Sequence, residues 1–125
     1  MRPYSILLLL LAGLPLPGGA AEQSGAQVYA AVCSECHATG KHDAPAFGDR
    51  KRWGRLVREG LDDLVPAALR GIRQMPAMGG KPDLSDLEVA RAVVHMANAG
   101  GGKFAEPTPG DAARWRKKAD AARKR

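Results

Sequence analysis

The segment Cys33-Ser34-Glu35-Cys36-His37 decides how this chain of 125 residues is organised. Its two cysteines are the only ones in the chain, and a histidine directly follows the second. Residues three positions apart lie on the same face of a helix, so both thiols can reach one edge of a flat ligand while the imidazole lies beside it. This spacing is typical of c-type haem attachment, in which the cysteines form thioethers and the histidine binds iron.

Two other interpretations use the same cysteines. The first is a disulfide between Cys33 and Cys36, as in thioredoxin-type redox motifs. The second is half of a zinc site, but structural zinc takes four ligands, and His42 and His95 do not form a second pair at short spacing. We therefore expect haem, with the disulfide as the main alternative.

Residues 1–21 are typical of a secretory signal peptide. Arg2 gives a basic start, an apolar stretch follows over residues 6–16, and Gly19-Ala20-Ala21 supplies small residues for cleavage. Prolines and glycines interrupt the stretch before it reaches the roughly 20 apolar residues of a membrane span. We expect export to the periplasm, with an uncleaved amino-terminal anchor as the alternative. Export agrees with the haem interpretation, since c-type haem is attached outside the cytoplasm.

Residues 22–106 form one small domain, which we expect to be all-α because no strand pattern of useful length occurs in it. Two capping boxes mark helix starts, Ser24 with Gln27 and Ser85 with Glu88. The first helix runs into the cysteine motif, and the second ends at Gly100. The sequence also predicts a loop over 39–52, a short helix over 53–59 stopped by Gly60, and a Pro/Gly loop over 75–82. Between them, Asp62 or Asp63 can cap a further helix that ends at Gly71, and Pro66 must fall in its first turn or delay its start.

Residues 107–125 read as a Pro/Gly linker followed by a basic tail. The segment 111–125 carries seven basic and two acidic side chains, so most of the net charge of +6 lies there. Ala112, Trp115, Ala119 and Ala122 share one helical stripe, but the stripe is narrow and rich in alanine. We therefore predict a disordered tail that makes electrostatic contact with an acidic partner or an anionic membrane surface. Export makes nucleic acid a poor partner.

An iron bound by His37 needs a second ligand on its other side. Met75 and Met78 lie in the Pro/Gly loop, which is free to fold over a haem. Met96 falls on the apolar face of the last predicted helix and is expected in the core, while His95 falls on the polar face and is expected in solvent. His42 follows His37 too closely to reach the opposite side. A loop methionine is therefore favoured.

The sequence resembles the class I c-type cytochromes, and most closely the small bacterial cytochrome c-five type. The resemblance runs in order from residue 24 to about residue 99, which makes it far more specific than the haem motif alone. The matching segments are Cys33-Ser34-Glu35-Cys36-His37-Ala38-Thr39-Gly40, Ala44-Pro45-Ala46-Phe47-Gly48-Asp49, Trp53 with Arg55, Met75-Pro76-Ala77-Met78-Gly79-Gly80, Leu84-Ser85-Asp86 and Ala92-Val93-Val94-His95-Met96.

The resemblance implies a class I cytochrome c fold in residues 22–106, with helices wrapped around one covalently attached haem c. It makes Cys33 and Cys36 the attachment residues, with His37 and Met75 as the iron ligands. It also implies that the Pro45 carbonyl accepts a hydrogen bond from His37, and that Trp53 lies near the haem propionates or in the core. Two departures stand out: Met78 is a possible rival ligand, and His95 replaces an aromatic residue packed between the first and last helices.

His/Met ligation leaves iron without an open position, which suits electron transfer and disfavours substrate binding. We therefore expect an exported carrier of single electrons between larger redox proteins, and no enzymatic activity. Two alternatives stay open: a redox subunit held on a membrane complex, and a haem-based ligand sensor or weak peroxidase with a labile methionine ligand.

Overall fold

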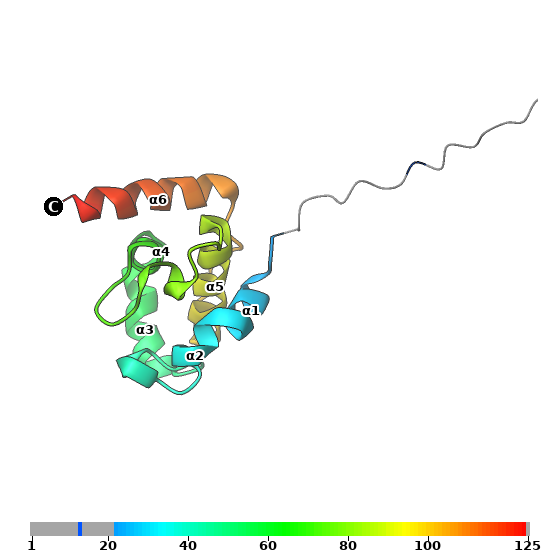
Figure 1. The fold of residues 1–125 in the computed structure, drawn as a ribbon. Helices are drawn as coiled ribbons and strands as arrows, with labels where there is room; N and C mark the ends of the chain where they lie inside the picture. Colours follow the sequence, from blue (N-terminus) through cyan, green and yellow to red (C-terminus); the bar gives the residue numbers. More distant parts are fainter. Residues whose placement is uncertain (1–12, 14–21, 125) are drawn as a thin grey trace, which may run out of the picture.

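The structure, a computed structural model, describes residue 13 and residues 22–124 (Figure 1). Apart from residue 13, the predicted signal peptide lies outside the described residues. Between residues 22 and 124 the chain is helical and forms no β-strand, so the predicted all-α class is confirmed. No helix in this described part is long and apolar enough to cross a membrane.

The N-terminal helix carries the cysteine motif. It consists of α1 (Gly25–Val28), a π-helical segment η1 (Tyr29–Cys33) and α2 (Ser34–His37), which follow one another without a break. The predicted capping box begins it, because the Ser24 hydroxyl accepts from the Gln27 N–H at 3.2 Å and the Gln27 side chain accepts from the Ser24 N–H at 2.9 Å. Local sequence therefore fixes the start of the helix that presents the motif.

Helix α5 (Asp86–Ala99) is the central helix against which α1 packs (Figure 1). Its predicted capping box is present, with Ser85 and Glu88 bonded to each other's backbone N–H groups, and Gly100 ends it. Gly25 makes the close crossing possible. A Cβ at this position would collide with the main-chain oxygen of Arg91, so only glycine lets the two backbones approach so closely.

Helices α3 (Arg50–Glu59) and α4 (Leu61–Arg70) depart from the prediction at their starts. Asp49 caps α3 by accepting from two backbone N–H groups at 3.1 Å, so this helix begins earlier than the predicted residue 53. The predicted caps of α4 at Asp62 or Asp63 were wrong. Gly60, at φ 85°, turns the chain directly from α3 into α4.

Pro66 was also misplaced by the sequence analysis, because it lies inside α4 and not in its first turn. It cannot donate the usual backbone hydrogen bond there. Its ring is among the most completely buried side chains of the described residues, together with Val65 and Leu69. Burial in the core offsets the lost hydrogen bond.

Two short helical turns lie in the predicted loops. They are η2 (Lys41–Asp43), after the motif, and η3 (Ala77–Gly80), in the loop that contains both candidate methionines.

The predicted disorder of the C-terminal tail was wrong. Residues Pro109–Arg123 form a helix, α6, which begins with a capping box between Thr108 and Asp111 and lies across α4 and α5 (Figure 1). Trp115 is 3% exposed, and its Nε1–H donates to Asp62 of α4 at 2.7 Å, which lowers the pKa of that carboxyl group. The apolar stripe is narrow, as the sequence analysis noted, but it carries one large side chain that inserts between two helices. Burial of that side chain orders the tail.

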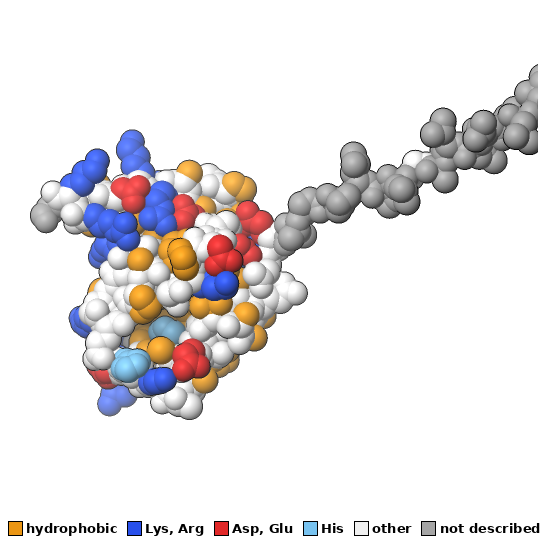
Figure 2. All heavy atoms as spheres, in the orientation of Figure 1, with side chains coloured by type: hydrophobic (Ala, Val, Ile, Leu, Met, Phe, Trp, Pro, Cys, Tyr) orange, Lys and Arg blue, Asp and Glu red, His pale blue; other side chains and the backbone are white. Residues whose placement is uncertain are grey.

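Three of the five basic side chains of α6 form ion pairs, which corrects the view of the tail as a free basic arm. Arg114 pairs with Asp62 and Asp111, Arg116 with Asp86 and Asp120, and Lys118 with Asp63. Figure 2 shows a few acidic side chains among the basic ones in the region of α6. The net charge of the segment is unchanged, but its field is partly neutralised at short range.

Replacement of Gly25 by alanine tests the α1–α5 crossing. The new methyl group would meet main-chain atoms that cannot rotate away, so Gly25→Ala should lower the free energy of unfolding by about 1–3 kcal/mol. Gly54→Ala in α3 is the matched control, because nothing lies within 4 Å of a Cβ there. The control should raise stability by about 0.5–1 kcal/mol through helix propensity. Denaturant titrations followed by far-UV circular dichroism measure the free energy of unfolding of both variants. An equal change in the two variants would contradict the close contact between α1 and α5 at Gly25.

Candidate functional site

The cysteine motif lies where the N-terminal helix changes its hydrogen-bond pattern. In η1 the Ser34 N–H bonds to the Tyr29 carbonyl, five residues earlier, so the helix is locally wider than an α-helix. Ordinary α-helical bonding resumes at Ala38, whose N–H bonds to the Ser34 carbonyl at 3.1 Å. Single-turn π segments of this kind are frequent at functional sites. The motif therefore lies on a locally distorted helix that nothing in the sequence analysis predicted.

His37 is the most constrained member of the motif. Its side chain is buried, and its Nδ1 lies 2.9 Å from the Pro45 carbonyl oxygen. A carbonyl oxygen only accepts, so Nδ1 carries the proton and Nε2 is left with a lone pair. The loop after the motif closes over this side chain, since the Phe47 N–H bonds to the His37 carbonyl. The hydrogen bond implied by the sequence resemblance is present, and it prepares the imidazole to bind a metal through Nε2.

The two cysteines carry free thiols, so the disulfide alternative does not describe this structure. Burial raises the pKa of Cys33 to about 11. Redox-active cysteines of the thioredoxin type instead have a lowered pKa, caused by a nearby cation or helix N-terminus. The described residues also contain no group of three or more His, Cys, Asp or Glu side chains able to hold a metal, so the zinc alternative has no support there.

Cys33 lies where two apolar cores meet. The larger core combines residues of α1, α4, α5 and α6, whereas the smaller contains Trp53, Met96 and Ala97. Cys33 packs against both. Hydrophobic and histidine side chains gather around a hollow in this face of the molecule (Figure 2). The half-buried apolar side chains that pack on these cores are Tyr29, Val32, Leu56, Val57, Leu61, Leu64, Met75, Met78 and Phe104.

These surroundings fit a haem. One buried imidazole offers a free Nε2, and two thiols lie one helical turn from each other. Methionine and aliphatic side chains pack on the same apolar core as Cys33. A large apolar ring system needs such a lining together with a nitrogen or sulfur ligand on each side of its iron.

We call residues 72–81, which contain Met75 and Met78, the methionine loop. Its helical turn η3 lies against α4 and against η1, which carries Cys33. Its entry is a tight turn, in which the backbone groups of Ile72 and Met75 bond to each other at 2.8 and 3.0 Å. Met75 is half-buried against the larger core, and Met78 packs on the same core. The two methionines differ in the neighbours of their sulfur atoms. The Met78 sulfur lies 3.2 Å from the guanidinium of Arg116 on α6.

The structure places the other candidate ligands in the core, in solvent or in contact with aromatic side chains. Met96 is 3% exposed in the smaller core, as predicted. His42 is exposed on η2. His95 was expected in solvent, and this was wrong. Its ring lies 5.6 Å from the Tyr29 ring and 5.4 Å from the Phe47 ring, so it packs between the first helix, α5 and the loop after the motif. Part of the polar face of α5 is covered by aromatic side chains that a helical wheel does not show.

Trp53 supports the loop beneath His37. It is buried, and its Nε1–H donates to the Ala46 carbonyl at 3.0 Å, while its ring lies 6.2 Å from the His37 ring. Together with the His37–Pro45 hydrogen bond, this contact fixes the loop from both sides. The core position considered for Trp53 is therefore observed.

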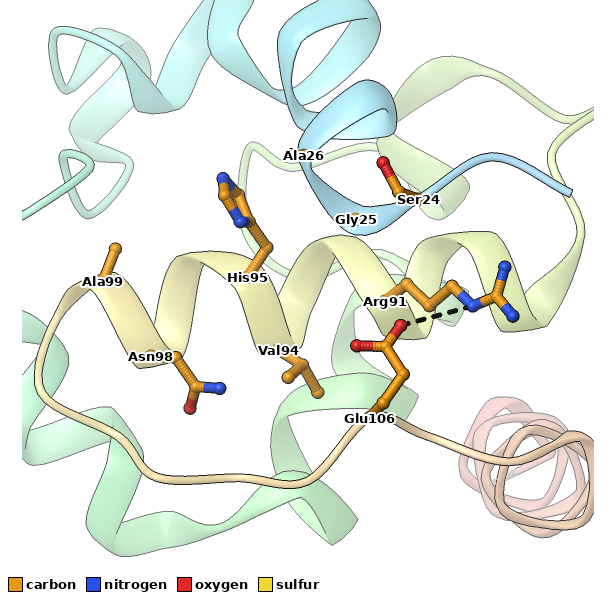
Figure 3. Close-up of a pocket in the computed structure, with 9 residues that line it drawn as sticks. All are labelled: Ser24, Gly25, Ala26, Arg91, Val94, His95, Asn98, Ala99 and Glu106. Atoms are coloured by element: carbon orange, nitrogen blue, oxygen red, sulfur yellow. Dashed lines mark ion pairs between the residues drawn. The ribbon is translucent and has the colours of Figure 1, made fainter.

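A separate pocket lies between α1, α5 and the segment that follows α5, away from the two cysteines (Figure 3). Arg91 and Glu106 form an ion pair at 3.4 Å in it. Asn98, on the same lining, uses its amide to bond the Phe104 backbone at 2.9 and 3.0 Å. These polar groups hold the segment 100–107 against α5, so we assign the residues of this pocket a structural role.

Sequence reasoning missed two contributors to the site, the aromatic cluster at Tyr29 and the guanidinium of Arg116. The spacing of Arg116 and Asp120 indicates a pair within one helix. No local pattern indicates that the same guanidinium reaches Asp86 and Met78.

The chain is similar in sequence to known proteins. Residues 20–96 match the family model described as "Cytochrome C oxidase, cbb3-type, subunit III". Cytochrome c-555 of Chlorobaculum thiosulfatiphilum is 36% identical over 58% of this chain and 90% of its own length. Cytochrome c5 of Azotobacter vinelandii is 37% identical over 63% of this chain and 98% of its own length.

A solved structure shows the same fold. A chain from the crystal structure of an electron transfer complex of nitrite reductase with cytochrome c has a TM-score of 0.60 and 31% sequence identity. The match covers 65% of this chain and 99% of that chain. Helix α6 begins after residue 96, where the family match ends.

Proposed function

The chain belongs to the cytochrome c family, and on that premise we propose that it is an exported carrier of single electrons with one His/Met-ligated haem. The family implies haem c bound covalently, with its iron. The observation that carries the proposal is the buried imidazole of His37. Its protonated Nδ1 donates to Pro45, its Nε2 is free, and it directly follows two thiols on one helix.

We assign the thioether bonds to Cys33 and Cys36 and the proximal iron ligand to His37. The Pro45 carbonyl holds the imidazole in one tautomer and one orientation, and makes Nε2 a better donor to the metal. Trp53 and the backbone bond between Phe47 and His37 keep that carbonyl in place. Covalent attachment also adds a large apolar surface to a domain with a small core.

We assign the second iron ligand to Met75. Met75 is the last residue of a tight backbone turn that fixes its main chain, and its side chain packs on the larger core. The Met78 thioether is engaged by Arg116, which makes it the weaker candidate. In this assignment the iron would be bound by a histidine from the helix and by a methionine from the loop.

This set of residues suits electron transfer and not substrate chemistry. Haem iron with His and Met ligands has a raised reduction potential and exchanges single electrons. The apolar side chains around the motif exclude water and disfavour the additional charge of ferric iron. With His37 and Met75 both bound to the iron, no position would be left for a substrate, and we propose no enzymatic activity.

We propose redox proteins as partners and the periplasm as the location. Related cytochromes carry electrons, and the similar solved chain comes from an electron transfer complex with nitrite reductase. The proposed export rests on the apolar amino-terminal sequence. Contacts with such partners are expected to be small and transient.

Covalent attachment of haem is the first test. Haem should stay on the wild-type protein after denaturation and extraction with acidified organic solvent, and the intact mass should exceed that of the polypeptide by one haem. The double variant Cys33→Ala/Cys36→Ala should release all of its haem under the same extraction, because no thioether can form. Complete extraction from the wild-type protein would contradict the proposed attachment.

Replacement of the two methionines tests the ligand assignment. Met75→Ala should abolish the weak sulfur-to-iron charge-transfer band of the ferric protein, lower the reduction potential and let the ferrous protein bind carbon monoxide. Met78→Ala, the matched control three residues away, should keep the charge-transfer band, because Met75 is still present to bind the iron. The reverse result would assign the ligand to Met78. Binding of carbon monoxide by the wild-type protein would favour a ligand sensor with a labile methionine.

A second candidate function is a redox subunit of a membrane complex. The description of the matching family model, which names a subunit of an oxidase, favours it. A mobile carrier should be released from its native membranes by high salt, because screening weakens contacts between exposed charges. Co-purification with a membrane complex in high salt would favour the subunit role instead.

A further inference from the structure

Arg116 of α6 joins three parts of the molecule at the methionine loop. Its guanidinium bonds both carboxylate oxygens of Asp86, at the start of α5, at 2.7 and 3.0 Å. A third contact, at 3.3 Å, goes to Asp120 one helical turn further along α6. The nitrogen that bonds Asp86 at 2.7 Å also lies 3.2 Å from the Met78 sulfur. Asp86 and Asp120 therefore hold the Arg116 guanidinium beside the methionine loop.

The position of Arg116 is set by the burial of its neighbour on α6. Trp115 is 3% exposed and bonds Asp62, while Ala112 and Ala119 are buried on the same face. The helix cannot rotate without exposing this face. The forked bond to Asp86 then fixes the plane of the guanidinium, because two parallel N–H donors meet two oxygens. The side chain is therefore a rigid arm from α6 to the loop.

The loop has a backbone that needs external support. Met78 has φ 60° and Arg73 has φ 51°, and both are left-handed conformations that non-glycine residues rarely adopt. Such residues persist only where surrounding structure holds them. Arg116 supplies a hydrogen bond to the side chain of one of the two.

We propose that Arg116 is a positioning residue that holds the methionine loop closed over the haem site. By binding the Met78 thioether it keeps that sulfur from competing for iron and holds Met75 in place as the ligand. The proposal rests on the proposed function, because it needs Met75 to be an iron ligand. It also gives α6, which lies beyond the segment that matches the family, a role in the properties of the site.

Competition by imidazole measures how readily the loop opens, because imidazole binds ferric iron only when the methionine leaves. Arg116→Gln should raise the apparent imidazole affinity of the holoprotein about tenfold, as expected for loss of a hydrogen bond that involves a charged group. Arg114→Gln is the matched control. It removes the same charge from the same helix, where Arg114 pairs with Asp62 and Asp111 and not with the loop. The control should stay within about twofold of wild type.

Two further measurements separate positioning from general destabilisation. Amide hydrogen exchange of Gly79 and Lys81, whose N–H groups bond within the loop, should speed up in Arg116→Gln and not in Arg114→Gln. Met78→Leu keeps the apolar volume but removes the sulfur, so it should also raise imidazole affinity. The double variant with Met78→Leu and Arg116→Gln should bind imidazole little more tightly than either single variant, because both substitutions remove the same contact.

Equal imidazole affinity in wild type, Arg116→Gln and Arg114→Gln would overturn the proposal. An equal rise in both arginine variants would also overturn it, since the effect would then come from charge or from loss of α6 packing. The Met75→Ala variant separates this failure from failure of the proposed function. If Met75→Ala binds imidazole no better than wild type, Met75 is not the ligand, whatever Arg116 does.

Discussion

The close contact between α1 and α5 at Gly25 is the constraint on which the rest of the structure depends. The N-terminal helix is continuous from Gly25 to His37, so its crossing point on α5 sets where both cysteines and the histidine lie. A side chain at Gly25 would force the helices apart, because it would meet the Arg91 main chain. The larger core then includes residues of both helices, Val28 of α1 together with Val89, Ala90 and Val93 of α5.

Around this crossing, the site is held by bonds between loops and helices. His37 is oriented by a carbonyl of the loop after it, and that loop is supported in turn by the indole of Trp53. The methionine loop is held by a tight backbone turn at one end and by Arg116 near the other. One proposed ligand, His37, thus lies on a helix and the other, Met75, on an irregular loop, and a few hydrogen bonds restrict the freedom of both. This arrangement provides preorganisation, which a redox centre needs in order to change charge with little movement.

Helix α6 shows how one large side chain can alter the function of a charged segment. Without Trp115, the segment has the composition of a solvated basic tail, which would be flexible and would attract anionic surfaces. Once Trp115 is buried, Asp62 and Asp63 of α4 and Asp86 of α5 face its basic residues and pair with them. The same charges then serve mainly to attach the helix, and one of them reaches the methionine loop.

The sequence by itself determined the cysteine motif, the capping boxes at Ser24 and Ser85, the core position of Met96 and the all-α class. All of these depend on residues within about one helical turn of each other, or on a single apolar periodicity. Tertiary structure alone decided that the residues of α6 form an ordered helix, that Pro66 lies inside α4, and that Arg116 reaches the methionine loop. Trp115 bonds a residue 53 positions away, and Arg116 contacts a sulfur 38 positions away. Contacts at such separation leave no local pattern, because they exist only after the helices have packed.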